Sequence, residues 1–280
     1  MKRNITTSKL CEKTGMSRQN FYKGRKQRQR RQIDADLIEE LVKAERAFQP
    51  RLGGKKLHYI LKPKLLEAGV RIGRDRFFAV LGERGLLLER LPKAPRTTNS
   101  RHSLPIFVNQ LAKMKLTGFN QAWVSDITYI RTDEGFLYLS LITDAWSRKI
   151  VGYHAGDTLE TEGCLMALEK AVKELMDGLF PMHHSDRGCQ YCSHLYTGKL
   201  REYGLGISMT EENHCYENAK AERVNGILKQ EYGLGIPFCT KQQAIASVDQ
   251  AVMLYNTRRP HLALNYKTPE EVHREVKKAA

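Results

Sequence analysis

The sequence predicts an α/β fold, with a mixed five-stranded sheet flanked by helices and preceded by small all-α modules of helix-turn-helix type. Residues 1–90 show apolar residues at helical spacing among many cations. Residues 122–157 are instead rich in β-branched and aromatic residues interrupted by turn signals, which indicates consecutive strands. Helical patterns then alternate with two short apolar runs as far as residue 257. This order is typical of a mixed sheet with helices packed on it.

The charge is distributed very unevenly along the 280 residues, whose net charge is +15. Residues 1–104 hold 26 Lys and Arg against 10 Asp and Glu, a net of +16, whereas residues 105–280 hold 20 against 21, a net of −1. Lys and Arg that neutralise phosphates release condensed counterions, so a strongly basic segment binds nucleic acid. We expect a DNA-binding region attached to a near-neutral body, although a basic surface without such a partner has the same composition.

A membrane partner is not expected. The longest apolar-rich run, which begins at Phe136, is much shorter than the roughly 20 residues of a membrane-spanning helix. Six scattered cysteines without an apolar N-terminal leader suggest reduced thiols. The sequence therefore predicts a soluble protein of the cytoplasm.

Residues 1–31 have the pattern of a helix-turn-helix segment. Leu10, Gly15 and Phe21 are spaced as a helix, a tight turn and a second helix, which Ser17 would cap. The side chains that the second helix would present to DNA are Arg18, Asn20, Lys23, Arg25 and Lys26. The basic run from Lys23 to Arg31 also fits a solvated helix face or a linker.

Residues 32–90 are expected to form a second helical module that binds DNA. Apolar spacing predicts a helix over 33–48 and another over 54–69, which Pro63 interrupts. Arg74 and Arg76 lie in the next expected helix and are candidates for DNA contacts. A purely structural helical hairpin explains this pattern equally well.

A basic, Pro-rich linker is expected over residues 91–108 and a core over residues 109–280. The predicted strands cover 122–130, parts of 135–157, a run that ends at Asp186, and 206–209. The predicted helices cover 161–176, 193–203, a segment from about 217, and 241–257.

Three acids of this core are candidates for chemistry. Asp126 lies inside an otherwise apolar strand, where a carboxylate is costly without a partner or a purpose. Asp186 ends another strand, and Gly188 would let the backbone turn away after it. Glu222 lies on the helix that follows. Two adjacent strands and a helix can bring three carboxylates together, and such hard ligands suit two Mg²⁺ or Mn²⁺ ions. Each acid alone also fits a turn cap or a solvated side chain.

A different metal site is conceivable at residues 183–193, "HHSDRGCQYCS". Cys189 and Cys192 have the C-x2-C spacing of a zinc site. His183 and His184 are adjacent, however, so both cannot easily turn toward one ion. These residues alone do not distinguish a zinc site from a carboxylate site.

One face of the helix around Glu222 carries further polar residues. Asn218, Glu222, Asn225 and Lys229 are spaced by 4, 3 and 4 residues and therefore share a face. Asn218, Asn225 and Lys229, together with Arg187 beside Asp186, are candidates for contacts with DNA.

Three segments resemble a known family. "WVSDITYI", "HSDRGCQY" and "ENAKAERVNGILKQE" are similar to the signature segments of insertion-sequence transposases of the retroviral-integrase (DDE) type, in particular their second-reading-frame (OrfB) class. The resemblance extends over nearly the whole chain, since "YNTRRPHLALNYKTPEEV" and "GGKKLHYIL" resemble the family's C-terminal and upstream segments. The spacing between Asp186 and Glu222 is the family's, and Lys229 stands where the family has Lys or Arg.

The resemblance implies a ribonuclease-H-like core with Asp126, Asp186 and Glu222 as catalytic metal ligands for two Mg²⁺ or Mn²⁺ ions. It implies a transposase that cuts an element's ends and joins the freed 3′ hydroxyl to other DNA. The implied partners are double-stranded DNA, as terminal inverted repeats and target, and further copies of the chain. In this family the variable positions of Cys189 and Cys192 do not bind metal, which disfavours the zinc site.

The chain also departs from the family pattern. Glu217 replaces the more usual Asp, and residues 209–218 are more acidic than the family's loop, which puts family-like DNA contacts there in doubt. Two other functions stay open: a ribonuclease-H-like nuclease without joining activity, and a DNA-end-binding regulator with an idle core. The sequence leaves undetermined the repeat sequence, the target, the oligomeric state and whether the active form is a frameshift fusion.

Overall fold

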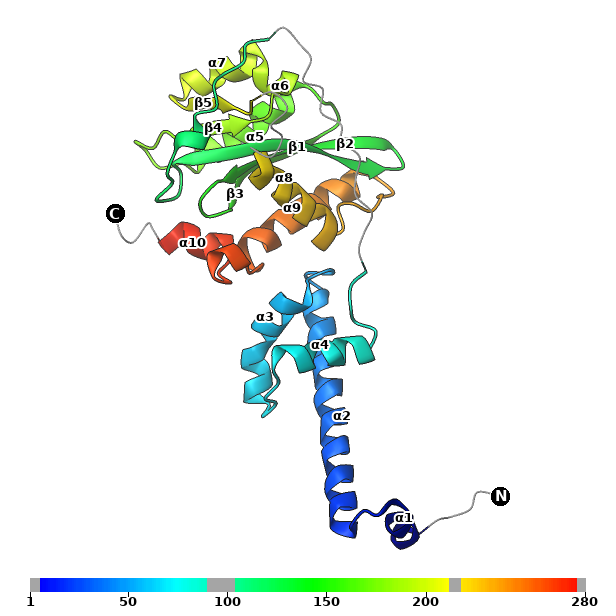
Figure 1. The fold of residues 1–280 in the computed structure, drawn as a ribbon. Helices are drawn as coiled ribbons and strands as arrows, with labels where there is room; N and C mark the ends of the chain where they lie inside the picture. The colour runs from blue at the N-terminus through cyan, green and yellow to red at the C-terminus, as the bar shows by residue number, and fades with distance from the viewer. Residues whose placement is uncertain (1–5, 90–103, 212–217, 276–280) are drawn as a thin grey trace. The chain divides into compact units, whose positions relative to one another are not determined.

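The computed structural model describes residues 6–89, 104–211 and 218–275. The chain divides into two compact units, one formed by residues 1–48 and 52–89 and the other by residues 49–51 and 90–280 (Figure 1). Most of the linker expected over 91–108 lies outside the described residues.

The first unit is all-helical, as expected. Its helices are α1 (Thr7–Thr14), α2 (Arg18–Arg46), α3 (Gly54–Glu67) and α4 (Arg74–Glu83). Gly15 ends α1 in the left-handed conformation (φ 66°), and the Ser17 hydroxyl accepts a hydrogen bond from the Asn20 N–H at 3.2 Å. The predicted helix, glycine turn and Ser17 cap are thus confirmed.

Two expectations for this unit are wrong. The predicted division between residues 31 and 32 falls inside α2, because the basic run is part of this helix; of the two alternatives left open for the run, it is a helix face and not a linker. The expected interruption at Pro63 does not occur either, since α3 runs through this residue. The unit's apolar core joins α2, α3 and α4 through residues such as Ile38, Leu61 and Phe77.

The second unit is built on a five-stranded sheet, which confirms the predicted fold class. Its strands are β1 (Ala122–Thr132), β2 (Gly135–Asp144), β3 (Ile150–Gly156), β4 (Met182–Ser185) and β5 (Gly206–Met209), in the order β3-β2-β1-β4-β5. β1 pairs with β2, and β2 with β3, in antiparallel fashion, whereas β4 runs parallel to both β1 and β5. The sheet is therefore mixed, with β1 at its centre.

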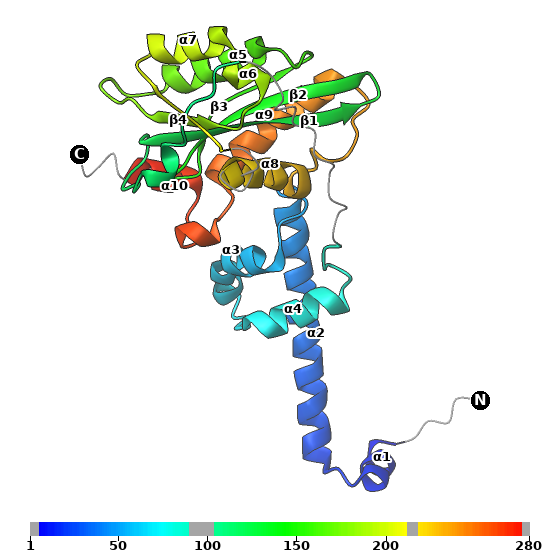
Figure 2. The ribbon, with the colours of Figure 1, turned by 45° about the horizontal axis from the view of Figure 1, so that its top comes forward.

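Helices cover both faces of this sheet (Figure 2). One layer contains α5 (Thr161–Lys173), α6 (Cys189–Cys192) and α7 (His194–Glu202), and the other contains α8 (Ala219–Glu231) and α9 (Lys241–Thr257). Alternation along β2 serves both layers: Leu139 and Leu141 pack with α8 and α9, whereas Ile142 packs with α5.

Shorter elements complete the unit. They are η1 (Leu111–Lys113), η3 (Leu262–Leu264) and α10 (Pro269–Glu275), none of which the sequence predicted individually. α10 is anchored by His273, whose Nδ1 lies 3.0 Å from the Ser147 hydroxyl.

Candidate active site

Asp126 lies within β1 on the face that α8 covers. Its carboxylate accepts two hydrogen bonds, at 2.8 Å from the side-chain amide of Asn225 in α8 and at 3.0 Å from the backbone N–H of Ile127. The residue is half-buried. A carboxylate is unfavourable inside an otherwise apolar strand, and here two hydrogen-bond donors compensate for that cost and hold the side chain in place.

Asp186 follows β4 directly and lies level with Asp126 of the neighbouring strand β1. Val124 of β1 stands opposite His184 of β4, so two residues further along each parallel strand come Asp126 and Asp186. The adjacent strands inferred from the sequence are thus confirmed.

Gly188 acts differently from what was expected. Its φ of −61° is available to any residue, so the turn does not require glycine. Its N–H instead donates to Asp186 Oδ1 at 3.0 Å, and a Cβ at this position would stand 3.1 Å from the same oxygen. Glycine is needed here because the carboxylate approaches the backbone closely.

Glu222 projects from the first turn of α8 and is exposed. Its relation to the other acids is electrostatic. Burial and the negative charges of Asp186 and Glu222 together raise the pKa of Asp126 to about 7, against the hydrogen bond from Asn225. The structure therefore brings β1, the end of β4 and α8 together so that the three carboxylates repel one another.

Lys229 lies on the same helix as Glu222 and is half-buried. Burial lowers the pKa of its ammonium group, and the negative charge of Asp126 partly offsets this shift. The negative charge of Asp126 thus acts on this cation, which shares a helix face with Glu222.

The other three candidates near the acids form hydrogen bonds within the protein. Asn225 and Asn218 are 5% and 3% exposed, and the Asn218 amide donates to the Ser125 carbonyl at 2.9 Å. The Arg187 Nε donates to the Thr210 carbonyl at 2.7 Å. These side chains hold β1, Asp126 and the end of β5 in place, a role that spacing along one helix cannot reveal.

The donor set suits a hard divalent cation. All three side chains offer carboxylate oxygens, which Mg²⁺ and Mn²⁺ prefer. Within the described ranges, no three His, Cys, Asp or Glu side chains are grouped as ligands of a single ion. Mg²⁺ generally takes only one or two protein carboxylates and completes its shell with water and substrate phosphate, so pairs of these acids fit it.

The zinc alternative at residues 183–193 is not supported, because its two histidines form hydrogen bonds inside the core. Both histidines point into the core. His183 Nε2 lies 2.7 Å from the Ser125 hydroxyl and 2.9 Å from the Tyr196 hydroxyl, and His184 Nδ1 lies 2.9 Å from the Ser208 hydroxyl. Cys192 is buried whereas Cys189 is exposed.

The candidate DNA contacts of the first unit differ in whether their side chains are already paired with acids of the protein. Those on α2, namely Arg18, Asn20, Lys23, Arg25 and Lys26, are all exposed. On α4, Arg74 pairs with Asp75 at 3.0 Å and Arg76 with Glu83 at 3.1 Å. Such exposed pairs are weak, but they lower the free positive charge of α4.

No helix among the described residues combines the length and the apolar character that crossing a bilayer requires.

Comparisons with known proteins agree with this geometry. Residues 117–215 and 203–269 each match a family model described as an integrase core domain. An uncharacterized 31 kDa protein of insertion element IS600 from Shigella sonnei is 33% identical over 264 residues, which cover 93% of this chain and 96% of that protein. The transposase InsF for insertion sequence IS3A from Escherichia coli K12 is 33% identical over 195 residues, or 69% and 68% of the two chains.

Solved structures with a similar fold include the HTLV-2 integrase catalytic core domain in complex with magnesium, at 19% identity and a TM-score of 0.46, covering 57% of this chain and 99% of that one. Another is a simian T-cell lymphotropic virus intasome, at 18% identity and a TM-score of 0.49, covering 79% and 74%. The family rests on the sequence relatives, which span most of the chain at one-third identity: the protein belongs to the insertion-sequence transposases with an integrase-type (DDE) core.

Proposed function

We propose that the protein cuts DNA at the ends of an insertion sequence and joins the freed 3′ hydroxyl to a phosphodiester of target DNA. The observation that carries this proposal is the convergence of Asp126, Asp186 and Glu222 from two adjacent parallel strands and a helix. The substrates are double-stranded DNA, namely the terminal inverted repeats of the element and the target.

The three acids would hold two divalent ions, Mg²⁺ or Mn²⁺. When bound, such ions activate the attacking oxygen and stabilise the leaving oxygen of an in-line displacement. The attacking group is water in the cutting step and the 3′ hydroxyl in the joining step.

Neighbouring side chains orient this site. Asn225 fixes one oxygen of Asp126, and the Gly188 N–H fixes one oxygen of Asp186. Lys229 is placed to bind a phosphate next to the scissile bond, because it is a half-buried cation in the field of Asp126. These contacts favour an active core over an idle one.

The first unit would supply most of the affinity for DNA through the exposed cations of α2. An element has two ends and each chain offers one set of the three acids, so we propose that a homo-oligomer assembles on DNA. Its place of action would be the bacterial nucleoid, where that DNA is.

The proposal is tested with duplexes that carry the terminal repeat, read from the DNA flanking this gene. In Mg²⁺, purified protein should yield a strand cut at the repeat's 3′ end and then a longer strand joined to target DNA. Cutting without any joined product supports a nuclease, and binding to the repeat without cutting supports a regulator. Either result contradicts the proposal.

A further inference from the structure

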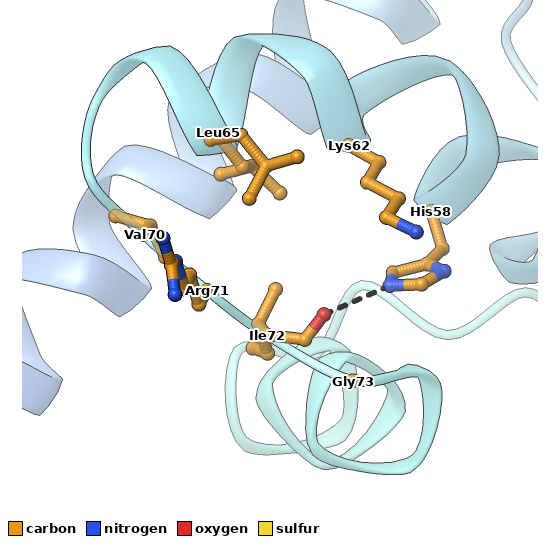
Figure 3. A pocket seen from close by; sticks show the side chains of 8 residues that line it. His58, Lys62, Leu65, Val70, Arg71, Ile72 and Gly73 are labelled. Atoms are coloured by element: carbon orange, nitrogen blue, oxygen red, sulfur yellow. Dashed lines mark hydrogen bonds between the residues drawn. The ribbon is translucent and has the colours of Figure 1, made fainter.

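The first unit contains a pocket that the chemistry above does not use. It has a volume of about 290 Å³ and lies between the C-terminal half of α3 and the loop that leads to α4. Figure 3 shows Lys62 and His58 on one side and Arg71 with Val70 on the other, with Leu65 and Ile72 between them. The pocket therefore combines an apolar lining with cations from two segments.

Lys62 and Arg71 are both exposed. Within the part of the chain that the structure describes, neither forms a hydrogen bond or an ion pair. Arg74 and Arg76, a few residues further on, are by contrast paired with acids. Lys62 and Arg71 are therefore available at the pocket for an external anion.

The pocket is also held in shape. The His58 ring in α3 contacts the Ile72 carbonyl at 3.1 Å through its Nε2 and packs against Phe77 of α4, with ring centroids 5.2 Å apart. This contact joins the loop to α3, and Phe77 itself is fully buried. An anion bound between Lys62 and Arg71 would not have to order the loop first, which lowers the cost of binding.

We propose that this pocket binds a phosphodiester and its deoxyribose from the backbone of duplex DNA. The two cations match the phosphate, and the apolar lining matches the carbon face of the sugar. α4 begins at Arg74, directly after the pocket, and no side chain caps its N-terminus. Its N–H groups add to the attraction for a phosphate that the pocket holds.

Such a contact would fix the position of the module on DNA without reading sequence. The inference rests on the proposed function in one respect, namely that the first unit binds DNA.

The test measures the affinity of the full chain for a random-sequence duplex by fluorescence anisotropy at several salt concentrations. Lys62→Gln with Arg71→Gln should lower the affinity and make the slope of log affinity against log salt shallower by about 0.9, the contribution of the one phosphate that the pocket holds. The matched control is Lys55→Gln with Lys64→Gln, which removes the same charge from exposed positions of α3 outside the pocket. The control slope should change much less.

A second variant keeps the charge and fills the space. Leu66 lines the pocket and is 47% exposed, so Leu66→Trp should fold and obstruct the pocket. It should weaken DNA binding as the double Gln variant does. Equal slopes for the two charge pairs, together with unchanged binding by Leu66→Trp, would overturn the inference.

The outcome is separable from that of the proposed function. If the pocket variants behave as described but no strand is cut or joined, the inference that the pocket binds DNA is supported and the catalytic proposal fails. If strands are joined but the pocket variants bind DNA like the control, only the pocket fails.

Discussion

At the scale of single residues, the strands that carry the acids depend on buried polar side chains that form hydrogen bonds inside the core. His183 illustrates this. It is 1% exposed in β4, between the Ser125 and Tyr196 hydroxyls. Burial lowers the pKa of its imidazole to about 3, and the adjacent His184 adds to the shift. His183 is therefore neutral in the folded protein and serves packing and hydrogen bonding.

This shift makes the stability of the protein depend on pH. Between pH 6.5, the ordinary pKa, and pH 3, the unfolded chain binds a proton at His183 that the folded chain does not. The contribution of the neutral His183 side chain to the free energy of unfolding is therefore complete above pH 6.5. It decreases as the pH falls from 6.5 toward 3, by about 1.4 kcal/mol per pH unit. Urea unfolding of the wild type and of His183→Gln from pH 7 to pH 4 checks this. The two stabilities should converge on acidification, and a constant difference would refute it.

Asn225 is a second residue whose role is local. Removing its hydrogen bond to the Asp126 carboxylate costs on the order of 1.5–3 kcal/mol, because the acceptor is charged. Asn225→Ala should therefore lower the strand-transfer rate about 10- to 100-fold and raise the Mg²⁺ concentration needed for half the maximal rate. Gln230→Ala, at an exposed position of the same helix, is the control. An unchanged Mg²⁺ requirement in Asn225→Ala would show that Asp126 is positioned without it.

At the scale of elements, α2 combines two environments in one helix. Its second half is anchored in the apolar core of the first unit through Ala35, Ile38 and Val42. No acid occurs from Lys13 to Ile33, and cations such as Lys23 and Lys26 stand three residues apart on one side. Like charges at this spacing destabilise a helix, so its first half depends on the anchored half and on external anions.

Hydrogen exchange can test this dependence. In the free protein, amides of residues 18–32 should exchange faster than those of 35–46. Duplex DNA should slow the exchange of 18–32, because phosphates neutralise the cations, while amides of α9 should not change. No protection of residues 18–32 at saturating DNA would mean that this half of α2 does not bind the backbone.

The contact between β3 and α5 depends on Gly152. A Cβ at this position would overlap the carbonyl oxygen of Ala167 and stand 2.8 Å from the Ala171 side chain. Gly152→Ala should therefore lower the free energy of unfolding by about 1–3 kcal/mol, the usual cost of overpacking. Gly198→Ala in α7, where a Cβ meets nothing within 4 Å, should instead raise it by about 0.5–1 kcal/mol. Thermal melts of the two variants that shift in the same direction would contradict this packing.

The sequence predicted these elements unevenly, for physical reasons. The β-branched and aromatic residues of β1 and β2 and the Ser17 cap are local signals, and the structure confirms the elements that they predicted. The continuity of α2 was missed because a run of like charges resembles a linker until an anchored helix extends it. The role of Asn225 was missed because its partner, Asp126, is 99 residues away in the chain.

At the scale of the whole molecule, the chain separates two tasks that its charge distribution already indicated. The first unit carries the basic residues, and the near-neutral second unit carries the three acids. Adjacent strands could be inferred from the position of the acids, whereas their parallel direction and the full strand order could not, since these depend on long-range pairing. The separation implies that binding and catalysis can be damaged independently.

The central claim is that Asp126, Asp186 and Glu222 act together on one displacement. Strand transfer of terminal-repeat duplexes in Mg²⁺ tests it most directly, with Asp126→Asn, Asp186→Asn, Glu222→Gln and the triple variant. Each single change should lower the rate on the order of 1,000-fold or more, nearly as much as all three, because the acids work as a unit. DNA binding should persist, and Cys189→Ser with Cys192→Ser should remain active. Acid variants that still cut and join, or an inactive double Cys variant, would contradict the claim.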